Sequence, residues 1–136
     1  MMRVWKSRAR SHRRGTVAIE YALILPLMLL FILGIMDAGR LLWTYTALYR
    51  ASEAAARCAA INTTDCGTAT QIKNRAVAEA WGLTINPSVF TVTAPLSCGV
   101  QVRADYEFTF IVPWFPWFGG APFGTITLNA TACYPQ

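Results

Sequence analysis

An apolar run of twenty residues, Val17 to Met36, is broken by one charged residue, Glu20. As a helix rising about 1.5 Å per residue it would span about 30 Å, the thickness of the hydrocarbon core of a bilayer. Positive charge lies before the run, whereas Asp37 and Arg40 roughly balance after it. Under the positive-inside rule, the run predicts a single-pass membrane helix with its N-terminal side in the cytoplasm and the rest of the chain outside.

A cleaved secretory signal is the alternative for this run. Such signals usually have a shorter apolar region that ends in a small-x-small site. Here the run ends Ile35-Met36-Asp37-Ala38, so a cut at Ala38 would have Met36 where a small residue is needed. The sequence favours a helix that stays on the chain.

The net charge of +5 comes from the N-terminal tail. Six of the twelve basic residues precede Gly15 with no acid among them, and from Gly15 onward six basic residues face seven acidic ones. A nucleic-acid partner is therefore not expected. The one histidine, His12, lies in that tail, and the sequence contains no CxxC, HExxH or DxDxDG motif. We expect no enzyme activity, metal, cofactor or small-molecule substrate.

The junction before the apolar run, Arg13-Arg14-Gly15-Thr16, resembles a class III (prepilin-type) signal. A cut after Gly15 would remove the basic leader and keep the apolar helix on the mature chain. Glycine has no side chain to obstruct a protease at the membrane surface.

Glu20 is the unusual residue of the run. A carboxylate near a bilayer centre costs about 2.5 to 3.5 kcal/mol and needs a partner or a wet edge. Cleavage would create a cationic amine on Thr16, about one helical turn away, on the same chain or on a neighbour. The alternative is that Glu20 snorkels at the cytoplasmic interface. Gly15 and the basic leader favour the role in processing.

Four segments together resemble the TadE-like family of pseudopilins from the tight-adherence (Flp-type) pilus system. They are Gly15 to Glu20, Tyr21 to Pro26, Gly34 to Arg40 and Ala54 to Arg57. The resemblance covers about residues 13 to 60, and downstream only the general pattern agrees. It implies cleavage between Gly15 and Thr16 by a membrane-embedded prepilin peptidase, and a role for Glu20 in processing or subunit registration. Thr16 is polar where type IV pilins prefer a large apolar residue, which leaves its N-methylation open.

The predicted organisation is a basic leader at 1–15, a long helix at 16–60 that spans the membrane in its first half, and an extracytoplasmic α+β cap at 61–136. Pro26 removes a backbone donor and predicts a kink, unless it is a neutral membrane proline. An alanine stripe packs either against the protein's own cap or against another subunit. Its members are Ala47, Ala51, Ala55 and Ala59.

The pattern of the cap predicts a pilin-like α+β fold. Thr68-Ala69-Thr70-Gln71 is typical of a capping box that opens a short helix, and Gly82 of its end. Apolar and polar residues alternate over 90–94, 100–110 and 125–131. These segments predict three antiparallel strands with one buried face, which the long helix covers.

Four cysteines in an oxidising compartment predict two disulfides, although three pairings are possible. The favoured pairs are Cys58 with Cys66 and Cys98 with Cys133. Each is worth on the order of 2 to 4 kcal/mol. In the strand alternation Cys98 shares the phase of the inward-facing residues, whereas Cys133 does not. Gly99 or the chain end must therefore interrupt the alternation for this pair to form.

An uncharged aromatic segment lies between the second and third strands. It suits the outer-leaflet interface, a contact with another subunit, or a lid over the core. Its aromatic residues are Trp114, Phe115, Trp117, Phe118 and Phe123.

The sequence predicts a structural pseudopilin of a bacterial inner membrane with a periplasmic cap, and leaves open whether it enters an extracellular pilus. The expected partners are the membrane, a prepilin peptidase, other pilins or pseudopilins and the pilus assembly platform. The alternatives are a pseudopilin of a secretion or DNA-uptake machine and an uncleaved membrane-anchored binding module.

Overall fold

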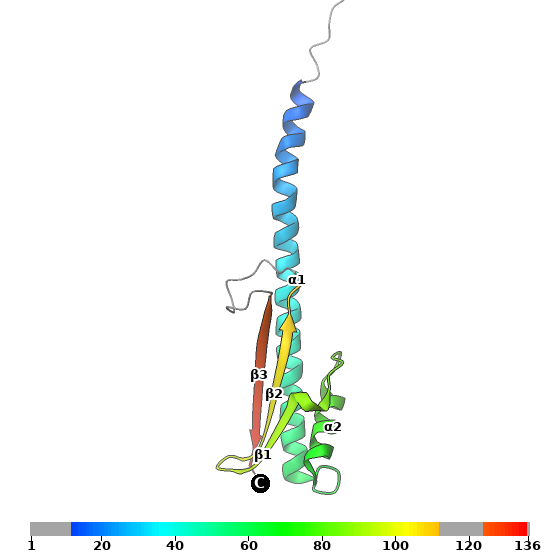
Figure 1. Cartoon of the computed structure of the whole chain (residues 1–136), viewed down its shortest axis with the longest axis vertical. Helices are drawn as coiled ribbons and strands as arrows, with labels where there is room; N and C mark the ends of the chain where they lie inside the picture. Colours follow the sequence, from blue (N-terminus) through cyan, green and yellow to red (C-terminus); the bar gives the residue numbers. More distant parts are fainter. Residues whose placement is uncertain (1–11, 112–123, 136) are drawn as a thin grey trace, which may run out of the picture. The chain divides into compact units, whose positions relative to one another are not determined.

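The computed structural model describes residues 12–111 and 124–135 (Figure 1). Its elements are α1 (His12–Ile61), α2 (Ala69–Glu79), the 3-10 helix η1 (Pro87–Val89), β1 (Phe90–Leu96), β2 (Gly99–Thr109) and β3 (Thr125–Tyr134). The chain divides into an N-terminal unit, Met1–Met36, and a folded unit, Asp37–Gln136. A long apolar helix, a short second helix and a three-stranded antiparallel sheet confirm the predicted α+β class.

The helix α1 begins at His12, four residues before the predicted start, and ends at Ile61. Arg13 and Arg14 are good helix formers, so nothing local stops the helix at Gly15. Pro26 lies inside α1, and the helix continues across it. A kink at Pro26 stays a prediction, as does the division of the chain into leader, helix and cap.

The sheet of the folded unit has the order β1-β2-β3, with both neighbouring pairs antiparallel. β2 and β3 pair along ten positions, from Val100 opposite Tyr134 to Thr109 opposite Thr125. The register between β1 and β2 shifts after Thr93, where Pro95 cannot donate to the ladder. One face is buried through Phe90, Val102, Ala104, Phe108 and Ala130, as the alternation predicts.

The second half of α1 supplies the other side of this core. All four alanines of the predicted stripe are buried there, and Ala51 and Ala55 are fully so. Leu48 and Ala56 add to the same core cluster as the strand residues. Small side chains let a helix approach a sheet closely. The stripe therefore packs in the protein's own core.

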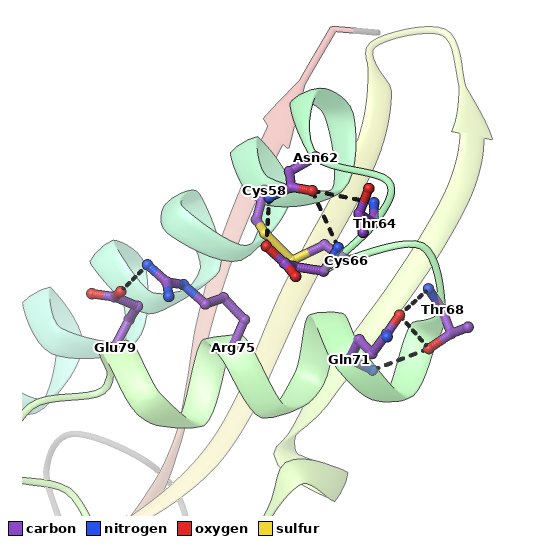
Figure 2. Close-up of a disulfide and its surroundings, with 9 residues drawn as sticks. Cys58, Asn62, Thr64, Cys66, Thr68, Gln71, Arg75 and Glu79 are labelled. Carbon is purple, nitrogen blue, oxygen red and sulfur yellow. Dashed lines mark hydrogen bonds and ion pairs between the residues drawn. A yellow bond between two sulfur atoms is a disulfide. The ribbon is translucent and has the colours of Figure 1, made fainter.

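The side chain of Asn62 makes several hydrogen bonds in the turn after α1, as Figure 2 shows. Asn62 accepts hydrogen bonds through Oδ1 from the backbone N–H groups of Thr64 and Asp65, and its Nδ2 donates to the Asp65 carboxylate at 2.7 Å. A disulfide between Cys58 and Cys66, whose Cα atoms are 5.8 Å apart, closes the turn against α1.

The capping box at the start of α2 is confirmed (Figure 2). Thr68 Oγ1 accepts from the backbone N–H of Gln71, and Gln71 Oε1 accepts from the backbone N–H of Thr68 at 3.1 Å. Ile72 and Ala76 form the buried side of the helix. α2 ends at Glu79, shortly before Gly82, which has a positive φ of 76°.

A second disulfide joins Cys98 to Cys133. Gly99, next to Cys98, has φ +103°, a conformation that side-chain-bearing residues rarely adopt. This left-handed residue interrupts the alternation between the β1–β2 turn and β2, so Cys98 can meet Cys133 on the outer side of the sheet. A Cβ at Gly99 would also collide with the carbonyl oxygen of Tyr134 and lie 2.8 Å from the Cα of Pro135.

We expect Gly99→Ala to lower the free energy of unfolding of the folded unit by about 1 to 3 kcal/mol, because it adds backbone strain and a collision. The matched control is Gly39→Ala, since Gly39 lies in α1 with nothing within 4 Å of an added Cβ. That change should stabilise the helix by up to about 1 kcal/mol. Denaturant unfolding in detergent micelles, followed by near-ultraviolet circular dichroism, measures both. Equal effects of the two substitutions would contradict the proposed role of Gly99.

Candidate functional site

The predicted processing junction lies in the first turns of α1, which include Gly15 and Thr16. Residues 1–11 of the predicted leader lie outside the described residues. Glu20 is exposed on the helix surface about one turn beyond Thr16. Cleavage and the role of Glu20 remain predictions.

The apolar run presents its side chains outward over almost its whole length. Large residues such as Leu23, Leu27 and Phe31 are about seventy per cent exposed within the protein. The most apolar window of the helix has a mean hydropathy of 2.4, and none of it is buried. An apolar surface of this size is unfavourable in water. The helix is long and apolar enough to cross a membrane.

Asp37 follows the apolar run directly, yet it is only 3 % exposed. Its Oδ1 accepts a hydrogen bond from Arg40 NH1 at 2.8 Å, one helical turn further along α1. Its Oδ2 accepts from the backbone N–H of Ile111 at 2.9 Å. Ile111 lies past the end of β2, so its backbone N–H takes no part in the hydrogen bonds between the strands. One carboxylate therefore connects α1 to the point where the chain leaves the sheet.

Arg40, which is half exposed, also contacts an aromatic ring. Its guanidinium carbon lies 5.2 Å from the centroid of the Phe108 ring, within range of a cation–π contact. Phe108 in turn makes an edge-to-face contact with Phe110 at 5.2 Å between ring centroids. The cluster of Asp37, Arg40, Phe108, Phe110 and Ile111, here called the Asp37 cluster, thus combines a buried acid with a half-exposed base.

The Asp37 cluster lies at the base of the connection between β2 and β3. The backbone N–H of Phe110 donates to the carbonyl oxygen of Gly124 at 2.8 Å and holds the two ends of this connection together. The predicted contact residues Trp114, Phe115, Trp117, Phe118 and Phe123 belong to the connection and lie outside the described residues.

Sequence reasoning recognised Asp37 and Arg40 only as balancing charges and as part of the family motif. Their spacing of three in a helix could have indicated the ion pair. Nothing local signals the bond to Ile111, which is 74 positions away. All four cysteines are in disulfides, and the described residues contain no group of three His, Cys, Asp or Glu that could hold a metal ion.

We expect Asp37→Ala to destabilise the folded unit by about 1.5 to 3 kcal/mol, because the N–H of Ile111 and the Arg40 guanidinium both lose a charged acceptor. Asp105→Ala is the matched control, since Asp105 pairs with Arg103 at 2.9 Å on the exposed face of the sheet. Exposed pairs are worth at most about 1 kcal/mol. Chemical unfolding of both variants in micelles tests the difference, and a loss no larger for Asp37→Ala than for Asp105→Ala would refute it.

The family described as TadE-like protein matches residues 15–57. Comparisons with curated proteins and with solved structures gave no significant match.

The matched segment begins at Gly15 and contains Glu20, the apolar run, Asp37 and Arg40. It ends in α1 one residue before Cys58, so β1, β2 and β3 lie beyond it. Residues 15–57 thus match the TadE-like family, the family that the sequence resembles.

Proposed function

We propose that this protein is a structural pseudopilin that takes part in assembling a tight-adherence pilus used in surface adhesion. A prepilin peptidase cuts it between Gly15 and Thr16, and the apolar helix then holds it in the bacterial inner membrane with the folded unit in the periplasm. Its partners are other pilins or pseudopilins and the pilus assembly platform. It acts by packing and anchoring, without chemistry of its own.

The observation that carries this proposal is the family match over residues 15–57. Its first residue is Gly15, the predicted last residue of the leader. The match also includes the whole apolar run, whose side chains find no packing partner in the described part of the protein. Such a helix requires lipid or the helices of other subunits around it.

The chemistry of Glu20 supports processing at Gly15. Its carboxylate is exposed on an apolar helix and has no ion pair among the described residues. In lipid such a charge needs a partner. Cleavage would supply one, because the new amine of Thr16 is cationic near neutral pH and lies about one turn away. On a neighbouring chain the same pair would set the offset between two packed helices.

The folded unit suits an oxidising compartment. Two disulfides join segments of a small core that contains many alanines. A core of this kind buries little apolar surface per residue, so covalent connections contribute much of the stability. Placement of this unit outside the cytoplasm agrees with the charge asymmetry around the apolar run.

The first test is the intact mass of the protein from its native membrane under non-reducing conditions. We expect a chain that begins at Thr16 and lacks four hydrogens, one pair for each disulfide. Gly15→Leu should leave the leader attached, because a large side chain obstructs the peptidase. Gly39→Leu is the control, since it adds the same side chain to an open helix position and should be cut normally.

Two other measured masses would contradict the proposal. A wild-type chain that still begins at Met1 would indicate an uncleaved membrane-anchored module, and a start beyond Met36 would indicate a secreted, soluble unit. A mass higher by one methyl group, located on Thr16 by fragmentation, would show that Thr16 is N-methylated.

A second test separates the two roles of Glu20. With Glu20→Gln, normal cleavage together with loss of cross-linking to other pilins would show registration, whereas an uncut chain would show a role in processing. Glu53→Gln, at an exposed position of α1 in the folded unit, is the control and should change neither result. Normal cleavage and normal cross-linking of Glu20→Gln would remove Glu20 from the mechanism.

A further inference from the structure

Two tryptophans of the folded unit, far apart in the chain, lie side by side on its surface. Trp43 is on α1 and Trp81 is in the connection between α2 and η1. Both line one cleft of about 420 Å³, together with Thr46, Ala47, Arg50 and Glu79. A Cβ built on Gly82, next to Trp81, would lie 3.6 Å from the indole nitrogen of Trp43. The fold thus brings Trp81 beside Trp43.

Neither indole is used in the core. Trp43 is 61 % exposed and Trp81 is 75 % exposed, and neighbouring Leu42 is 66 % exposed. Large apolar side chains held at a surface mark a contact with another apolar medium or molecule. We call Leu42, Trp43 and Trp81 the tryptophan patch.

The exposed face of α1 changes in character along the folded unit. After the exposed Arg40 its exposed residues include Leu42, Trp43, Tyr45 and Tyr49, whereas Arg50, Glu53 and Arg57 follow. The aromatic part is the part that follows the apolar run. Tryptophan and tyrosine concentrate at membrane–water interfaces, where one end of the ring system is apolar and the other is wet.

Distances along α1 place the patch within reach of lipid headgroups. Trp43 is six residues beyond Asp37, which corresponds to about 9 Å of helix. Arg50 lines the same cleft two turns further on and has no ion pair among the described residues. Its cation can meet a lipid phosphate while the indoles lie below it.

We propose that the tryptophan patch docks the folded unit onto the lipid surface from which its helix emerges. The occupant of the patch is the interfacial layer of phospholipid, with the two indoles among the glycerol and carbonyl groups and Arg50 at the phosphates. The proposal rests on the proposed membrane span, and it goes further because it assigns lipid contact to Trp81, which is 45 residues beyond Met36 in sequence.

The test uses the full chain in phospholipid vesicles at high dilution. All five tryptophans are changed to phenylalanine, and single tryptophans are returned at position 43 or 81. Lipids brominated near the carbonyl end of their acyl chains quench indoles that touch them. We expect such lipids to remove about half or more of the emission at either position, and deeply brominated lipids to quench less. Trp81 is the decisive reporter, because the proximity of Trp43 to lipid follows largely from its place in the chain.

Two further single-tryptophan variants distinguish failure of the docking proposal from failure of the proposed membrane span. Phe31→Trp in the same background reports the apolar run and should be quenched most by deep bromines. Tyr134→Trp lies at the far end of β3, nine residues from Thr125 and so about 30 Å along the strand, and should not be quenched. Circular dichroism confirms that each variant is folded.

Each outcome has a defined meaning. If Phe31→Trp is quenched while Trp81 stays unquenched and accessible to acrylamide, the docking proposal is wrong and the membrane span stands. If Phe31→Trp is not quenched, the span itself fails. If Trp81 is shielded from acrylamide only at high protein density and is never quenched by bromine, a second copy of the chain covers the patch, and lipid docking is overturned.

Discussion

The apolar face of a three-stranded sheet must be covered, and in this protein the cover is the second half of α1. Ala51 and Ala55 are fully buried in this contact, and Leu48 fills the space beside them. A sheet that is apolar on one face must bury that face against another element. Because the covering helix continues in the chain from the apolar run, folding of the unit and the proposed membrane anchoring depend on the same element. A substitution that enlarges an alanine of the stripe would push the sheet away from its support.

The Asp37 cluster lies where these two roles meet. A carboxylate at the first position after an apolar run would ordinarily be solvated, but here it is buried against the end of β2. Its burial is compensated by two donors, one of them on Arg40 and one on the backbone. Removing either donor would weaken the compensation of this buried charge, which is costly. The cluster therefore fixes the connection between β2 and β3 to a defined point of α1.

Local patterns predicted much of this structure from sequence. Period-two alternation identified the buried face of the strands, and Thr68 with Gln71 identified the start of α2, because both signals lie within a few residues of chain. The sequence left open whether the alanine stripe faces its own cap, since a small residue suits either partner. The bond from Ile111 to Asp37 and the neighbourhood of Trp43 and Trp81 could not be predicted. Each depends on loop closure over tens of residues, which leaves no local periodicity.

The two disulfides differ in how much chain they enclose, and under the proposed membrane topology this difference would set an order of oxidation. Cys58 and Cys66 are separated by 8 positions, whereas Cys98 and Cys133 are separated by 35. Short loops close at lower entropic cost. In a chain that leaves the membrane from its N-terminal side, the first pair can join before either later cysteine is present. If the Cys58–Cys66 disulfide formed first, Cys133 would be the one remaining partner for Cys98. The other two of the three possible pairings would then not arise during biogenesis.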